Sequence, residues 1–105
     1  MKYYNFHIGD YTSHTSHLSP MEDLAYRRML DLYYSTEKPL PKDGEAIGRL
    51  IRLRDNPIEV QTVLREFFTI SDEGWINNGA EKVLSGFRKM AEGGKKGAKN
   101  FGGGL

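Results

Sequence analysis

Hydrophobic residues recur at helical spacing in the first half of the chain, after a helix start signal at Ser19–Glu22. There a serine can cap the helix, a proline fits its first turn, and a glutamate completes a capping box. The helix is expected to run to about Ser35. Its apolar face comprises Met21, Leu24, Ala25, Tyr26, Met29, Leu32 and Tyr33. Leu30 and Tyr34 fall outside that face, which predicts that a second side of the helix is also covered.

Two shorter helices are expected after a proline-containing connector at residues 38–42. The first spans about Gly44 to Leu53, with Asp43 as its cap. The second begins at Asn56–Glu59, which repeats the cap-proline-glutamate signal, and runs to about Phe68. Apolar side chains at helical spacing give each of these helices one buried face.

Beyond these helices the pattern indicates a hairpin and one more helix. Residues 68–70 and 75–76 favour β-structure and flank a glycine-containing turn at residues 71–74. The last helix is expected from about Ala80 to Glu92. Its buried positions are expected to be Val83, Leu84, Phe87 and Met90. From Gly93 onward the chain is rich in glycine and lysine, a composition that predicts a flexible tail.

The order of helix, short helix, helix and hairpin is that of a winged helix-turn-helix. The sequence therefore predicts an α+β, mostly helical fold with a three-helix core, a two-stranded wing and an extra C-terminal helix. The first 18 residues, rich in aromatic and β-branched side chains, are expected to form an extended arm. We expect a winged-helix-like domain over residues 1–92 and a flexible basic tail or truncated linker over residues 93–105.

Composition narrows the class of protein. A chain of 105 residues suits one domain, and the absence of cysteine excludes disulfides, thiolate zinc sites and a cysteine nucleophile. The N-terminus does not resemble a secretory signal, and no apolar run approaches the roughly 20 residues that span a bilayer. We therefore expect a soluble, cytoplasmic protein that does not contact a membrane.

Charge is distributed unevenly, although the formal net charge is only +1. Residues 44–54 carry +2, residues 55–78 carry −4, and residues 79–105 carry +4. This polarity indicates an anionic partner for the basic regions.

Four runs of the sequence resemble a known family: residues 2–11 (KYYNFHIGDY), 15–19 (TSHLS), 25–34 (AYRRMLDLYY) and 36–41 (TEKPLP). They resemble the YdaU-like domain of unknown function found at the N-terminus of phage and prophage replication proteins. The resemblance covers residues 2–90. It implies a winged-helix fold, a role associated with phage DNA replication in a bacterial host, and a basic Gly/Lys linker that leads into a variable C-terminal region.

Ten basic residues are candidates for contact with nucleic acid. They are Arg49, Arg52, Arg54, Arg65, Lys82, Arg88, Lys89, Lys95, Lys96 and Lys99. The first three flank the turn between the second and third helices, where they could hold phosphates. The three on the last helix could extend that surface, and the three tail lysines could follow a nucleic-acid backbone. Ordinary solvation of these charges is the alternative.

Base reading by the third helix is a weaker hypothesis. Its exposed face would offer Ile58, Gln61, Thr62 and Arg65, and the glutamine and arginine could pair with adenine and guanine. Glu59 and Glu66 on the same helix oppose the approach of phosphates.

The remaining polar and aromatic groups favour structural roles. His14 and His17 lack a second cluster of ligands, so no metal site or cofactor is expected. The serines near Asp10 and His17 lack a nucleophile elbow, so no enzyme is expected. His17 is expected to bond to the backbone or to Asp10, and Arg28 needs a carboxylate, for which Asp10 is the candidate. An aromatic set could stack single-stranded bases but at these spacings favours a core: Tyr3, Tyr4, Phe6, Tyr11, Tyr26, Tyr33 and Tyr34.

Two hypotheses follow. The first is a DNA-binding accessory module of a phage replication protein, which contacts phosphates of single- or double-stranded DNA without base specificity. The second is a protein-interaction or oligomerisation module that binds replisome proteins or a second copy of itself.

Overall fold

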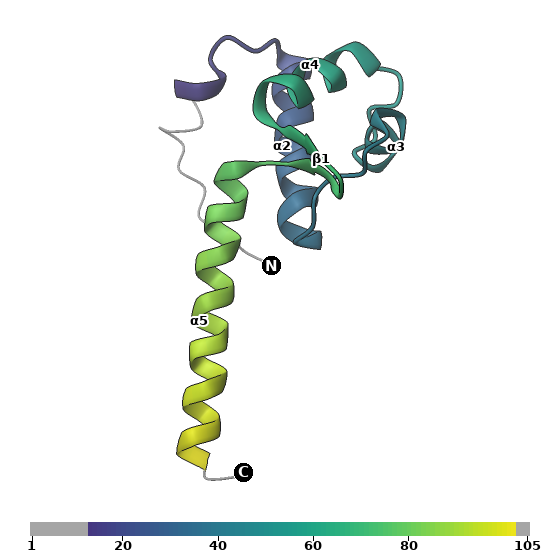
Figure 1. The fold of residues 1–105 in the computed structure, drawn as a ribbon. Coiled ribbons are helices and arrows are strands. Elements are labelled where there is room, and N and C mark those ends of the chain that lie inside the picture. The colour runs from purple at the N-terminus through teal and green to yellow at the C-terminus, as the bar shows by residue number, and fades with distance from the viewer. Residues whose placement is uncertain (1–12, 103–105) are drawn as a thin grey trace.

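The computed structural model describes the backbone of residues 13–102 and the side chains of residues 13–90. A helical turn at residues 13–15 precedes the named elements. These are α2 (Pro20–Thr36), α3 (Gly44–Leu50), α4 (Pro57–Phe67), β1 (Thr69–Ser71), β2 (Gly74–Ile76) and α5 (Asn78–Gly102). The fold is α+β and mostly helical, with two antiparallel strands (Figure 1).

The start of α2 is fixed by the predicted capping box. The Glu22 amide donates to the Ser19 hydroxyl at 3.2 Å, and the Ser19 amide donates to the Glu22 carboxylate at 2.8 Å. The helix ends at Glu37, whose backbone is left-handed with φ of 56°. Both ends therefore depend on local hydrogen bonds, and the start signal in the sequence is confirmed.

The core forms where α2 packs against α4 and α5, while α3 packs against α4. Its buried members are Ala25, Met29, Leu30, Tyr33, Tyr34, Leu40, Ile47, Ile51, Leu53, Val60, Val63, Leu64, Phe68, Ala80 and Leu84. Burial of Leu30 and Tyr34 confirms that α2 is covered on a second side. Residues 1–12 of the expected arm lie outside the described residues. Its described part differs from the prediction, because residues 13–15 are helical and the Leu18 amide donates to the Thr15 carbonyl.

The second helix ends earlier than expected, at Leu50 rather than Leu53. Arg52 takes a left-handed backbone conformation with φ of 62°. The Leu53 amide then donates to the Gly48 carbonyl at 2.7 Å, and the Arg52 amide donates to the Arg49 carbonyl at 3.2 Å. These two bonds form a Schellman motif, which closes a helix by reversing the handedness of one residue.

The hairpin lies at residues 69–76, as predicted, with Thr69 opposite Ile76 and Ser71 opposite Gly74. A third segment joins it: Leu40, between α2 and α3, exchanges two backbone hydrogen bonds of 2.9 Å with Trp75. Gly74 permits this approach. Its φ is 134°, and a Cβ built there would lie 2.0 Å from the Leu40 carbonyl oxygen.

The last helix differs most from its prediction. α5 begins at Asn78 and continues to Gly102, ten residues past the expected end at Glu92. The absence of proline lets the backbone ladder run through a segment predicted to be a flexible tail, although four of residues 93–102 are glycine. Of the four positions expected to be buried, only Leu84 is; Val83, Phe87 and Met90 are exposed because α5 leaves the body of the molecule (Figure 1). The division into residues 1–92 and 93–105 stays a prediction.

Candidate nucleic-acid interface

Three exposed arginines surround the turn that connects α3 to α4. Arg49 lies in the last turn of α3, Arg52 is the left-handed residue of the Schellman motif, and Arg54 follows two residues later. We call these three residues the arginine turn. Among residues 13–90, the ion pairs of the structure involve none of them. The turn therefore presents three cationic groups to solvent on a stretch of six residues.

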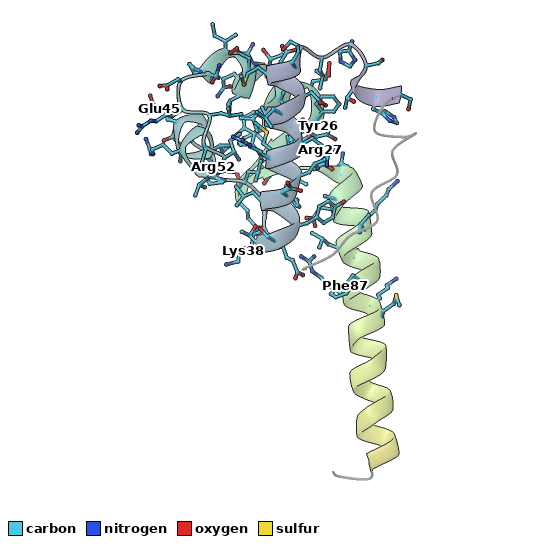
Figure 2. All side chains as sticks on the ribbon, turned by 180° about the vertical axis from the view of Figure 1, so that it is seen from behind. Tyr26, Arg27, Lys38, Glu45, Arg52 and Phe87 are labelled. Carbon is cyan, nitrogen blue, oxygen red and sulfur yellow. The ribbon has the colours of Figure 1, made fainter. Side chains whose placement is uncertain are left out.

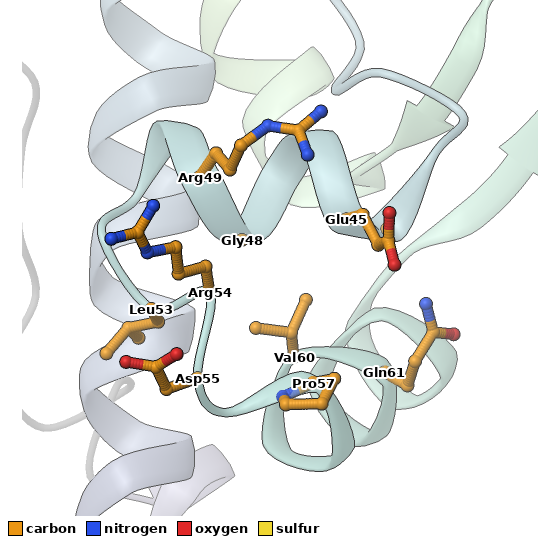
Figure 3. A pocket seen from close by; sticks show the side chains of 10 residues that line it. Glu45, Gly48, Arg49, Leu53, Arg54, Asp55, Pro57, Val60 and Gln61 are labelled. Atoms are coloured by element: carbon orange, nitrogen blue, oxygen red, sulfur yellow. The ribbon is translucent and has the colours of Figure 1, made fainter.

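Two adjoining hollows lie at this turn. One, of about 370 Å³, is lined by Arg49, Arg52, Leu53, Arg54, Asp55 and Asn56. The other, of about 360 Å³, lies between α3 and the start of α4 (Figure 3). Arg49 and Arg54 line both hollows, and Glu45 lies on the far side of the second, toward Gln61 (Figure 3). Asp55 also lines both hollows, so the end of this surface nearest the Schellman motif carries three arginines against one carboxylate.

Arg28 supports the arginine turn from α2. Its guanidinium donates to the Ile51 carbonyl at 3.0 Å and lies 3.5 Å from the Arg52 carbonyl. The prediction that Arg28 needs a carboxylate missed these main-chain acceptors, and Asp10 lies outside the described residues. Arg28 therefore satisfies carbonyls at the end of α3 and places a fourth cation beneath the turn.

The exposed face of α4 adds little positive charge. Arg65 is exposed, and Ile58 is 78% exposed, but the Thr62 hydroxyl donates back to the Ile58 carbonyl at 2.8 Å. Glu66 accepts hydrogen bonds of 2.7 and 2.8 Å from His17. His17 thus bonds to a carboxylate on α4, a partner that was not predicted, and Asp10 lies outside the described residues.

The basic residues of α5 do not extend the arginine turn. In Figures 1 and 2, α3 and α5 lie on opposite sides of α2, and Arg52 and Phe87 are separated accordingly. The hairpin directs α5 away from α3, so the structure does not bring these basic residues next to the arginine turn. Lys82 and Lys89 are exposed. Lys95, Lys96 and Lys99 lie on the α5 backbone beyond the side chains that the structure describes.

Arg88 has a structural role that the sequence analysis missed. Its guanidinium donates to the Glu37 carbonyl at 2.9 Å and lies 3.9 Å from the carboxylates of Glu37 and Glu81. Glu81 also accepts a hydrogen bond of 2.5 Å from the Tyr33 hydroxyl. We call these four residues the α2–α5 clamp. Charge alone could not reveal it, because Arg88 and Glu37 are 51 residues apart.

The other candidate groups take structural positions within the described residues. Tyr26 stacks on Phe67 with ring centroids 4.1 Å apart, while Tyr33 and Tyr34 are buried in the core. His14 approaches Ser13 at 3.5 Å. In the same part of the chain, no group of three histidine, aspartate or glutamate side chains could hold a metal ion. Among the described helices, none has the length and apolar character needed to span a membrane.

Comparison with known proteins gives a family without an assigned activity. Residues 2–94 match the family described as "Protein of unknown function (DUF1376)". The chain is 32% identical over 90 residues to the uncharacterized protein YdaU of Escherichia coli strain K12, which covers 85% of this chain. It spans only 31% of the length of YdaU. No solved structure matches. With a family match over most of its length, the chain belongs to the DUF1376 family.

Proposed function

We propose that this chain is a winged-helix module that binds DNA through phosphate contacts at the arginine turn. The order α2, α3, α4 and hairpin supports the winged-helix assignment. So does the pairing of Leu40 with Trp75, which gives the hairpin a short third strand between the first two helices of the core. In the proposed fold, α4 corresponds to the recognition helix.

One observation carries the binding proposal. Arg52 occupies the left-handed position of a Schellman motif, where glycine is the usual residue because a Cβ costs free energy there. A long cationic side chain at that strained position, beside Arg49 and Arg54, is better explained by a ligand than by folding. Three arginines suit phosphate oxygens, which guanidinium groups bind through paired hydrogen bonds.

The arrangement favours contacts to the backbone of DNA over reading of its bases. The first turn of α4 carries the half-buried Glu59, and the hairpin tip carries the exposed Asp72 and Glu73. These carboxylates oppose close insertion of α4 and the wing into a groove. The resemblance to domains of phage replication proteins makes replication the context we propose, with a bacterial cytoplasm as its location.

The test is binding of the whole chain to labelled single- and double-stranded oligonucleotides over a series of salt concentrations. If each arginine neutralises one phosphate of duplex DNA, substituting Arg49 and Arg54 by glutamine lowers the salt slope by about 2. Lys38→Gln is the matched control, because Lys38 is an exposed cation at the C-terminal end of α2. Absence of binding at low salt, or an equal effect of the control, would contradict the proposal.

A protein-interaction function is the second candidate, favoured by the apolar side chains that α4 and β1 expose. Ile58 and Ile70 are 78% and 52% exposed, within the stretch of residues 55–78 that carries a net charge of −4. Ile58→Ser should then weaken capture of the partner without changing DNA binding.

A further inference from the structure

The apolar face of α5 continues past the point where the helix leaves the core. Ala80 and Leu84 are buried against the body, whereas Val83, Phe87 and Met90 are 39%, 45% and 78% exposed. The three exposed residues follow one another at intervals of four and three, so they lie on one side of the helix. Figure 2 places Phe87 on the part of α5 that projects from the molecule.

The same spacing extends through the rest of the helix. Intervals of four and three alternate along Val83, Phe87, Met90, Gly94, Gly97 and Phe101. This is the spacing of the heptad repeat by which helices pair side by side, with glycine in place of an apolar side chain at positions 94 and 97. The positions that flank the seam are also uncharged: Leu84, Gly86, Ala91, Gly93, Ala98 and Asn100.

Every charged residue of α5 lies away from this seam. They are Glu81, Lys82, Arg88, Lys89, Glu92, Lys95, Lys96 and Lys99, all at the outer positions of the heptad. Two copies with the same positive charge would normally repel each other. Because the flanking positions are uncharged, two α5 helices can pair along the seam while their lysines remain in solvent on the outside.

We propose that α5 is a dimerisation helix that pairs with α5 of a second copy of this chain. A projecting helix of 25 residues with glycine at six positions is poorly stable alone in water. Pairing supplies the packing it lacks and buries Phe87 and Met90 in a self-complementary contact. A lipid surface fits less well, because glycine occupies both seam positions between Met90 and Phe101, where membrane-surface helices carry bulky apolar residues.

The proposal is independent of DNA binding and is tested without nucleic acid. Sedimentation equilibrium of the full chain over a wide concentration range should give twice the chain mass of 12.0 kDa at the upper end. Phe87→Glu places a charge on the seam and should raise the dimer dissociation constant at least about tenfold. Ser85→Glu adds the same charge to the outer face of the same helix and should leave the constant within about twofold of the wild-type value.

Circular dichroism and Trp75 fluorescence of both variants show whether the core stays folded, since Phe87 and Ser85 are both exposed. A wild-type chain that remains monomeric at every concentration overturns the proposal. If such a monomer binds vesicles of anionic phospholipid, the partner of the seam is a membrane surface. If Phe87 is shielded from solvent within the monomer, the partner of the seam is the segment of residues 1–12. Equal dissociation constants for Phe87→Glu and Ser85→Glu also overturn it.

Discussion

At the scale of single residues, a change at Arg52 should affect the stability of the fold and the proposed DNA binding in opposite directions. Its φ of 62° is a conformation that glycine adopts without strain. Arg52→Gly should therefore keep the Schellman motif and raise the free energy of unfolding by up to about 1 kcal/mol. The same change removes one guanidinium and should weaken DNA binding. Urea denaturation and oligonucleotide binding measure the two effects, and a loss of stability would contradict the strain argument.

Arg28 acts on the same turn from below. Replacing it with methionine removes the donor that binds the Ile51 carbonyl and leaves that half-buried group without its partner. We expect the free energy of unfolding to fall by about 1–2 kcal/mol. Arg28→Lys keeps the charge and a donor and should lose less stability. If the Arg28→Met variant is as stable as the wild-type protein in thermal unfolding, the turn does not depend on this hydrogen bond.

At the scale of elements, Gly74 allows the hairpin to pair with Leu40, in the segment between α2 and α3. A Cβ at this position would overlap the Leu40 carbonyl oxygen, and the backbone there is left-handed. Gly74→Ala should therefore lower the free energy of unfolding by ~2 kcal/mol, because the Leu40–Trp75 pairing must break. Gly86→Ala is the control: a Cβ on that α5 residue meets nothing within 4 Å, so helix propensity predicts a gain. Equal effects in urea denaturation would contradict this account.

The sequence predicted helix starts better than helix ends. The starts of α2 and α3 depend on capping side chains next to the first helical residue, which are visible in any sequence. α4 also begins at the predicted proline, Pro57, although Asn56 makes no side-chain cap hydrogen bond. The end of α3 was hidden because an arginine, and no glycine, occupies the left-handed position. The extent of α5 could not be predicted, because the glycine-rich composition from Gly93 onward favours a flexible tail. The exposure of Val83, Phe87 and Met90 could not be predicted either, because it depends on the direction in which the hairpin sends the helix.

The candidate site was predictable only where it is local. Arg49, Arg52 and Arg54 are neighbours in the sequence, so their grouping at one turn could be predicted. The support from Arg28 and the diversion of Arg88 into the α2–α5 clamp depend on contacts across 23 and 51 residues. Neither partner can be predicted from the sequence, because the partner of Arg28 is a main-chain carbonyl and the partner of Arg88 is one acidic residue among many.

At the scale of the whole molecule, the α2–α5 clamp determines how firmly the projecting helix is attached. Tyr33 is fully buried on α2, and its hydroxyl donates to Glu81 on α5. Burial, followed by the hydrogen bond to that carboxylate, raises the pKa of Tyr33 far above its usual range. The neutral hydroxyl is thus the form that the folded state requires.

Stability should consequently fall in alkaline solution. Because the folded-state pKa of Tyr33 is raised, its contribution is complete below the unfolded pKa of about 10 and is lost as the pH rises above that value. Tyr33→Phe should be less stable than wild type by about 1 kcal/mol at neutral pH, since the hydrogen bond to Glu81 is absent. Above pH ~10 the difference should shrink and reverse, because phenylalanine cannot ionise in the unfolded state. Urea denaturation of both proteins at neutral and alkaline pH measures this crossing, and parallel pH profiles would show that Tyr33 does not link α5 to the core through a neutral hydroxyl.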